Sequence, residues 1–236
     1  MKTYINKTIA FILSIVLLCS VTISAQAKND VENITLGKTM QYTFDWANDD
    51  FQHWYKFVPS RTATYTAKIS TTDERVRNDS GAISLEIWDD SENAIVSGLW
   101  SDLSLSATAK AKLTKGKTYY IYIEFWQNQQ IPISTVLNIN IPATKITKLT
   151  SGNKQFKVKW KKVAIADGYK IQYSTDKKFK KGVKTVSAIG TKTTSYTIKK
   201  LKKNKKYYVR IRAYKITGNT SPYSSWSKVK TVKTKK

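Results

Sequence analysis

Apolar and polar residues alternate one by one along much of this chain, and this period of two most restricts its fold. Successive side chains of a β-strand point to opposite faces of a sheet, so the pattern predicts strands with one face in a core. One such run is residues 207–214, where the inward positions are Tyr207, Val209, Ile211 and Ala213. In the first half, strands are predicted at residues 41–46, 54–58, 62–70, 83–88, 103–109, 118–126 and 133–141. Turn-forming clusters separate these runs, which predicts an all-β chain of antiparallel sandwiches.

Residues 1–27 have the three parts of a secretory signal peptide. Two lysines precede an apolar run over residues 9–23. Ala25 and Ala27 are small residues at the two positions that signal peptidase recognises. The run has about 15 residues, fewer than the roughly 20 that span a bilayer. A lipoprotein signal would need a small residue before Cys19, where a leucine stands. We therefore expect a secreted protein that loses residues 1–27 and has no transmembrane segment.

Charge divides the remaining chain between residues 143 and 144. Residues 28–143 carry 11 basic and 14 acidic side chains, whereas residues 144–236 carry 28 basic and 2 acidic ones. A step from a net charge of −3 to +26 is typical of a domain boundary. Pro142 ends the last strand pattern before the step. We expect one β-sandwich in residues 28–143 and a second in residues 144–236.

Three motifs in the first half resemble the bacterial pre-peptidase C-terminal domain. They are DDFQHWYKF at residues 49–57, LEIWD at residues 85–89 and LTKGKTYYI at residues 113–121. In the first motif, Gln52 and His53 replace the acidic residue that usually precedes the tryptophan. The resemblance implies a β-sandwich accessory module of a secreted protein, often beside a peptidase. The sequence contains no peptidase domain of its own.

Residues 143–233 resemble a fibronectin type III domain. Trp160 matches the buried tryptophan of an early strand, and Ser224–Ser227 match the entry to the last strand. Leu201 and Tyr207, six residues apart, match the tyrosine corner, in which a buried hydroxyl fixes the preceding loop. Lysine-rich versions of this kind look like those on surface proteins of anaerobic Firmicutes. The resemblance implies the fold and says little about function.

This resemblance leads to two expected contacts in the second half. We expect the Tyr207 hydroxyl to donate a hydrogen bond to the backbone, while Tyr208 faces outward. We also expect Trp226, at the start of the last strand, to stack near Arg210 and Arg212, because both arginines lie on the outward face of one strand.

The sequence offers little for catalysis or for a metal. The one histidine, His53, lies in a fold motif, and no Gly-x-Ser-x-Gly elbow is present. A single cysteine excludes a multi-cysteine metal site. Two acidic turns offer oxygens to calcium, but neither forms a recognised calcium loop, and we interpret them as solvated. Their residues are Asp45, Asp49, Asp50, Asp89 and Asp90. We expect no enzyme and no cofactor, with calcium as the open alternative.

Aromatic residues in the first half suggest a ligand surface. Tyr120, Tyr122 and Trp126 share one strand face, and sugar rings stack on flat aromatic faces. The alternative is that this face is the second wall of the core or packs on the other domain. If exposed, the strip suits a glycan or a protein ligand.

The lysines of the second half exceed what solubility requires. Lys157, Lys159 and Lys161 alternate with core residues, so they form a row with a spacing of about 6.6 Å, similar to phosphates along an extended polyanion. We expect Lys170 and Arg210 on a neighbouring strand to extend the row, together with Arg212. For a secreted protein, cell-wall teichoic acid is a better candidate than intracellular nucleic acid; extracellular DNA and acidic glycans stay open.

Together these features predict a secreted, non-enzymatic binding or adhesion protein associated with the cell surface. The second sandwich would attach it to an anionic envelope polymer, and the first would bind a glycan or an extracellular or host protein. The alternative is an accessory subunit of a secreted hydrolase, for substrate capture or folding. A small glycan-cleaving enzyme is a third hypothesis.

Overall fold

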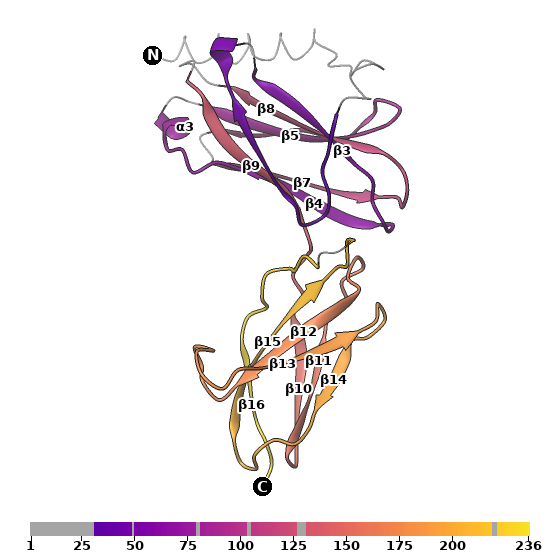
Figure 1. Cartoon of the computed structure of the whole chain (residues 1–236), viewed down its shortest axis with the longest axis vertical. Helices are drawn as coiled ribbons and strands as arrows, with labels where there is room; N and C mark the ends of the chain where they lie inside the picture. Colours follow the sequence, from indigo (N-terminus) through magenta and orange to yellow (C-terminus); the bar gives the residue numbers. More distant parts are fainter. Residues whose placement is uncertain (1–30, 49, 79–80, 103–104, 127–130, 219–220) are drawn as a thin grey trace, which may run out of the picture. The chain divides into compact units, whose positions relative to one another are not determined.

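The computed structural model describes residues 31–48, 50–78, 81–102, 105–126, 131–218 and 221–236 (Figure 1). The predicted signal peptide and Asp49 lie outside these residues. No helix within the described ranges is long and apolar enough to cross a membrane. The described residues form an all-β structure of four sheets, as the alternation predicts.

The first sandwich contains nine strands in two sheets. One sheet has the order β1 (Glu32–Asn33), β3 (Gln52–Phe57), β8 (Tyr119–Trp126), β5 (Ala82–Asp89) and β6 (Ala94–Asp102). The other has the order β2 (Thr39–Phe44), β9 (Ile133–Asn140), β4 (Ala63–Ser70) and β7 (Ser106–Leu113). Two short elements join the strands, the 3-10 helix η1 (Trp46–Asn48) and the helix α3 (Arg75–Asn78).

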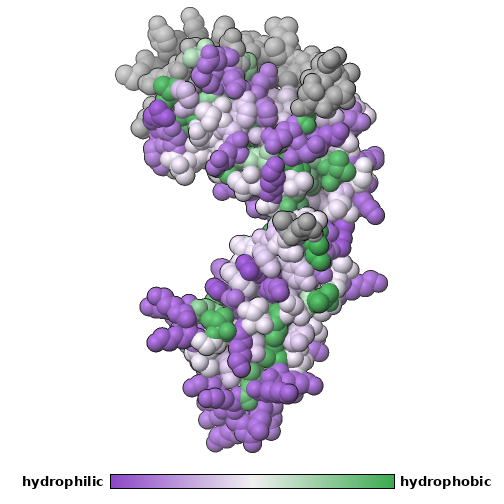
Figure 2. All heavy atoms as spheres, viewed as in Figure 1, coloured by the Kyte–Doolittle hydropathy of each residue, from purple (hydrophilic) through white to green (hydrophobic). Residues whose placement is uncertain are grey.

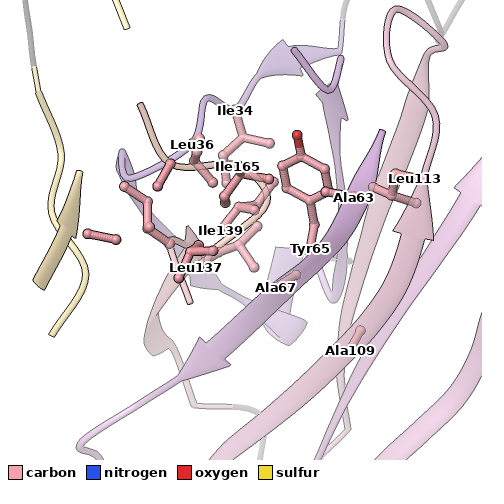
Figure 3. Packing of buried hydrophobic residues seen from close by; sticks show 14 of the residues in the cluster. Ile34, Leu36, Ala63, Tyr65, Ala67, Ala109, Leu113, Leu137, Ile139 and Ile165 are labelled. Atoms are coloured by element: carbon pink, nitrogen blue, oxygen red, sulfur yellow. The ribbon is translucent and has the colours of Figure 1, made fainter. Parts of the chain in front are cut away.

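The core of the first sandwich comes from the inward positions of both sheets. On β8, Ile121, Ile123 and Phe125 are at most 1% exposed. On β4 and β9, the inward residues include Tyr65, Ala67, Leu137 and Ile139, which Figure 3 shows packed together. On β8, the alternation predicts correctly that Ile121, Ile123 and Phe125 face the core.

The second sandwich packs a three-stranded sheet on a four-stranded sheet (Figure 1). The smaller sheet has the order β10 (Ile146–Gly152), β11 (Gln155–Trp160) and β14 (Ser195–Ile198). The larger has the order β13 (Lys184–Ile189), β12 (Gly168–Ser174), β15 (Lys206–Tyr214) and β16 (Lys230–Lys233). Trp160 at the end of β11 is 3% exposed, as its match to the early-strand tryptophan implies.

A tyrosine hydroxyl fixes the same kind of loop in each sandwich. The backbone N–H of Lys202 donates to the Tyr207 hydroxyl at 3.2 Å, and the N–H of Thr114 donates to the Tyr119 hydroxyl at 3.0 Å. The expected corner at Tyr207 is therefore present. Its direction is not the expected one, because the hydroxyl accepts the hydrogen bond from the backbone instead of donating it.

Candidate functional site

The lysine row lies on the exposed face of the three-stranded sheet. Lys157 and Lys159 of β11 are exposed, whereas Phe156 and Val158 between them are completely buried. Lys161, directly after the strand, is also exposed. The alternation of β11 therefore holds the charged groups outward along one line.

Register places a further lysine directly across from this row. Lys148 of β10 pairs with Lys159 of β11, so two cations face each other on neighbouring strands. Two more cationic pairs are directly opposed in the four-stranded sheet, Lys170 with Arg212 and Lys206 with Lys233. Like charges opposite each other destabilise a sheet by roughly 0.2–1 kcal/mol per pair. The fold thus tolerates three unfavourable pairs within one small domain.

Asp167, one of the two acidic residues of the second sandwich, is held by hydrogen bonds from neighbouring groups. Its carboxylate accepts hydrogen bonds from the Lys215 ammonium at 3.0 Å and from the Ile216 N–H at 2.8 Å. Burial alone would raise the pKa of Asp167, but these hydrogen bonds and the positive charge of Lys215 outweigh it and lower the pKa. Asp167 therefore stays ionised within this network.

The other acidic residue, Asp176, caps a turn. Its carboxylate accepts backbone N–H groups of Lys178 at 2.9 Å, Lys180 at 2.7 Å and Lys181 at 3.1 Å, and these hydrogen bonds lower its pKa. Both carboxylates of residues 144–236 are thus bonded away from the lysine row. Neither carboxylate is shown bonded to a lysine of the row.

The two arginines lie in a stack of aromatic rings on the four-stranded sheet. The guanidinium carbon of Arg210 is 4.5 Å from the Trp226 ring centre, and that of Arg212 is 4.4 Å from it, which confirms the expected stacking. Phe179 covers Arg210 at 4.3 Å, and Tyr223 covers Arg212 at 3.8 Å. Burial, followed by repulsion from Arg212, lowers the pKa of Arg210. We name these five side chains the arginine stack.

The expectation that Lys170 and Arg210 extend the lysine row on a neighbouring strand is wrong. Lys170 and Arg210 lie on β12 and β15 of the four-stranded sheet, whereas the row lies on the other sheet. Arg210 also donates to the side-chain oxygen of Gln172 at 2.8 Å, and the Lys170 ammonium donates to the Ser187 hydroxyl at 2.7 Å. The neighbours of β11 are β10 and β14, so Lys148 is the basic residue that widens the row.

The predicted aromatic strip lies on the outer face of the five-stranded sheet. Tyr120 and Tyr122 are each 2% exposed, and Trp126 is half-buried. The ring of Trp54 lies 4.5 Å from that of Tyr122 and 6.5 Å from that of Tyr120. The Tyr122 hydroxyl donates to the Gln52 side chain at 3.0 Å. The three residues share a strand face, as expected, but Tyr120 and Tyr122 are buried against Trp54 and offer no exposed flat strip on which a sugar ring could stack.

The acidic turns hold their carboxylates in local hydrogen bonds. Asp45 accepts the side-chain amide of Asn48 at 2.7 Å, and Asp50 accepts the Tyr42 hydroxyl. Asp89 accepts the N–H groups of Ser91 and Asn93, each at 2.9 Å. Asp90 accepts the Tyr120 hydroxyl at 3.3 Å, and Asp49 lies outside the described residues. Among described residues, no three His, Cys, Asp or Glu side chains are grouped to hold a metal ion.

His53 packs against aromatic rings in the first sandwich. Its ring stacks on Tyr42 at 4.1 Å and meets the edge of Tyr55 at 4.7 Å. This packing supports the interpretation of His53 as a residue of the fold.

Comparison with known proteins finds one family model that matches the second sandwich. The fibronectin type III domain model matches residues 142–230. No curated protein matches the chain. Among solved structures, the pre-peptidase C-terminal domain of collagenase from Bacillus anthracis is 14% identical, with a TM-score of 0.36, over 46% of this chain and 93% of that one.

Two fibronectin type III structures are also similar. The chicken CNTN1 FN1–FN3 domains are 13% identical, with a TM-score of 0.35, over 76% of this chain and 69% of that one. The FN5 domain of Drosophila Lar is 22% identical, with a TM-score of 0.32, over 39% of this chain and 95% of that one. The match of the fibronectin type III domain model to residues 142–230 agrees with the resemblance seen in the sequence.

Proposed function

We propose that the chain is a secreted, non-enzymatic binding protein whose fibronectin type III domain attaches it to an anionic polymer of the cell envelope, such as teichoic acid. Fibronectin type III domains are commonly binding or adhesion modules. In this proposal a second ligand, a glycan or an extracellular protein, binds the first sandwich at a surface other than the buried tyrosines Tyr120 and Tyr122.

One observation carries the proposal: Lys148 and Lys159 face each other across β10 and β11. Two ammonium groups in this position repel each other, and the two carboxylates of the domain are bonded elsewhere. A bound polyanion relieves this repulsion, because each phosphate can lie between cations of both strands. Lysine suits such a partner, since its compact charge needs no fixed bidentate geometry.

A single charge reversal in the lysine row should change thermal stability and polymer binding in opposite directions. In the full chain, Lys159→Glu replaces the repulsion from Lys148 with attraction. We expect it to raise the thermal midpoint at low salt, by a stabilisation of about 0.2–1 kcal/mol, and to weaken binding to purified lipoteichoic acid. Thermal denaturation and binding isotherms at the same ionic strength measure both effects.

The matched control is Lys184→Glu, which makes the same change in net charge at an exposed position. Lys184 pairs with Tyr173 instead of with a cation. This control should retain most of the binding and gain less stability. Equal loss of binding in both variants would mean that net charge, and not the row, determines attachment. Unchanged binding in both variants would contradict the proposed function.

A further inference from the structure

Three segments meet at the end of the second sandwich where the chain terminates. The Leu201 N–H donates to the Lys154 carbonyl at 2.9 Å, which joins the β14–β15 connection to the β10–β11 turn. The Asn204 N–H donates to the Lys235 carbonyl at 3.2 Å, and the Lys235 N–H donates to the Gly152 carbonyl at 3.0 Å. Figure 1 shows both turns at the same end as the C-terminus. Backbone hydrogen bonds therefore hold the three segments as one unit.

The three segments at this end are rich in exposed lysines. Segments 152–155, 199–206 and 233–235 contain no aspartate or glutamate. Figure 2 shows hydrophilic residues gathered at this end of the second sandwich. These segments contain nine exposed lysines, and we name six of them the lysine end: Lys154, Lys200, Lys202, Lys203, Lys205 and Lys235.

Two of these lysines occupy strained backbone positions. Lys154 has a φ of 50° and Lys200 a φ of 59°, in the left-handed region where a Cβ atom is unfavourable. Glycine or asparagine adopts this conformation more easily, and asparagine does so at Asn204, with a φ of 49° in the same loop. The chain therefore keeps a positive charge where a neutral residue would fit the backbone better. Strain of this kind is often found at functional sites.

We propose that the lysine end is a second anion-binding site, which takes a compact group of closely spaced phosphates such as tripolyphosphate. The inference rests on the proposed polyanion binding and adds a site to it. Its lysines surround one end of the domain, whereas the row on β11 follows a line with about 6.6 Å between charges. A compact, densely charged group matches the first arrangement, and an extended polymer matches the second.

The test uses paired substitutions in the full chain with tripolyphosphate as the probe. Lys154→Asn with Lys200→Asn removes two charges from the lysine end and places a better residue at each strained position. We expect the dissociation constant for tripolyphosphate to rise about three- to tenfold, as for the loss of two exposed charge contacts. We also expect the thermal midpoint to rise. Titration calorimetry at low salt and thermal denaturation measure the two effects.

The control pair is Lys162→Asn with Lys192→Asn, at the opposite end of the sandwich. Both lysines are exposed, and the Trp160 N–H donates to the Thr194 carbonyl at that end, where β11 finishes. These substitutions should change the dissociation constant for tripolyphosphate by less than about twofold, because only the overall charge falls.

Each outcome decides a separate point. If both pairs of substitutions weaken tripolyphosphate binding equally, or if neither weakens it, the lysine end is not a binding site. A lower thermal midpoint for Lys154→Asn with Lys200→Asn would overturn the strain argument. If lipoteichoic acid binding is lost on charge reversal of Lys159 while tripolyphosphate binding survives at the lysine end, the proposed function stands and this site remains distinct. If lipoteichoic acid never binds, the proposed function fails, and tripolyphosphate alone decides whether the lysine end binds phosphate.

Discussion

Tyr119 and Tyr207 show how far a single residue can be understood from spacing alone. Each follows a leucine by six positions, and each hydroxyl accepts a backbone N–H from the loop between them. The spacing predicts which tyrosine is buried. It does not predict the direction of the hydrogen bond, because a hydroxyl can donate or accept and the orientation of the loop decides between them.

Loss of the Tyr207 hydroxyl should destabilise the second sandwich. In Tyr207→Phe, the Lys202 N–H loses its acceptor, and we expect a decrease of about 0.5–1.5 kcal/mol in the free energy of unfolding. Urea denaturation, with tryptophan fluorescence as the signal, measures the change. Tyr208→Phe is the control, because Tyr208 is only half-buried on the other face and should change stability little. Equal shifts in the two variants would contradict the assigned strand register.

The carboxylate of Asp167 should make stability depend on pH. Its folded-state pKa is lowered, so it contributes stability at pH values above the unfolded pKa of about 3.9, and this contribution is lost as the pH falls through the folded pKa. Asp167→Asn should therefore lower the free energy of unfolding at pH 7 by about 1–3 kcal/mol. The difference from wild type should shrink at about pH 3. A difference that stays constant from pH 7 to pH 3 would refute the assignment.

Among the elements, β6 and β7 show where sequence patterns fail. The alternation gives no strand at residues 94–102, where β6 lies, because serine and glycine interrupt its apolar positions. A strand was expected at residues 103–109, whereas β7 spans Ser106–Leu113. Its inward residues are mostly alanines, at 107, 109 and 111, whose small size gives a weak hydrophobic signal. In the β2-β9-β4-β7 sheet of the first sandwich, these alanines face the core together with larger residues such as Leu113.

The arginine stack should hold the segment before β16 on the four-stranded sheet of the second sandwich. Trp226→Ala removes the ring that both Arg210 and Arg212 contact. Each exposed contact of this kind contributes about 0.5–1 kcal/mol, so the loss should be about 1–2 kcal/mol. Thermal denaturation followed by circular dichroism measures it. Trp226→Phe, which keeps an aromatic face, should lose less; an equal loss would point to packing area alone.

For the whole molecule, the charge pattern indicates which part of the chain to search for a site but not which residues meet there. The step in net charge near residue 143 and the lysine row on β11 are both visible in the sequence. The pairing of Lys148 with Lys159 depends on strand register, and the separation of Lys170 and Arg210 from the row depends on which strands share a sheet. These features arise from long-range contacts. A period of two defines the face of each residue but not its neighbours across the sheet.

The same limit applies to the aromatic strip and to the lysine end. Tyr120 and Tyr122 are predicted to share a face, and they do, but Trp54 from another strand packs against them. The lysine end combines segments about 50 and 80 residues apart in the chain, joined by backbone hydrogen bonds. Only the three-dimensional arrangement shows that these lysines form one surface.

The most direct measurement is the salt dependence of binding to purified lipoteichoic acid. Counterion release makes log affinity fall linearly with log salt, with a slope of about −0.7 to −0.9 per phosphate contact on nucleic acids. Four contacts, from Lys148, Lys157, Lys159 and Lys161, predict a slope of about −3 to −4, and changing the three lysines of the row to glutamate should make the slope much shallower. Binding that persists unchanged in molar salt would contradict electrostatic attachment through the second sandwich.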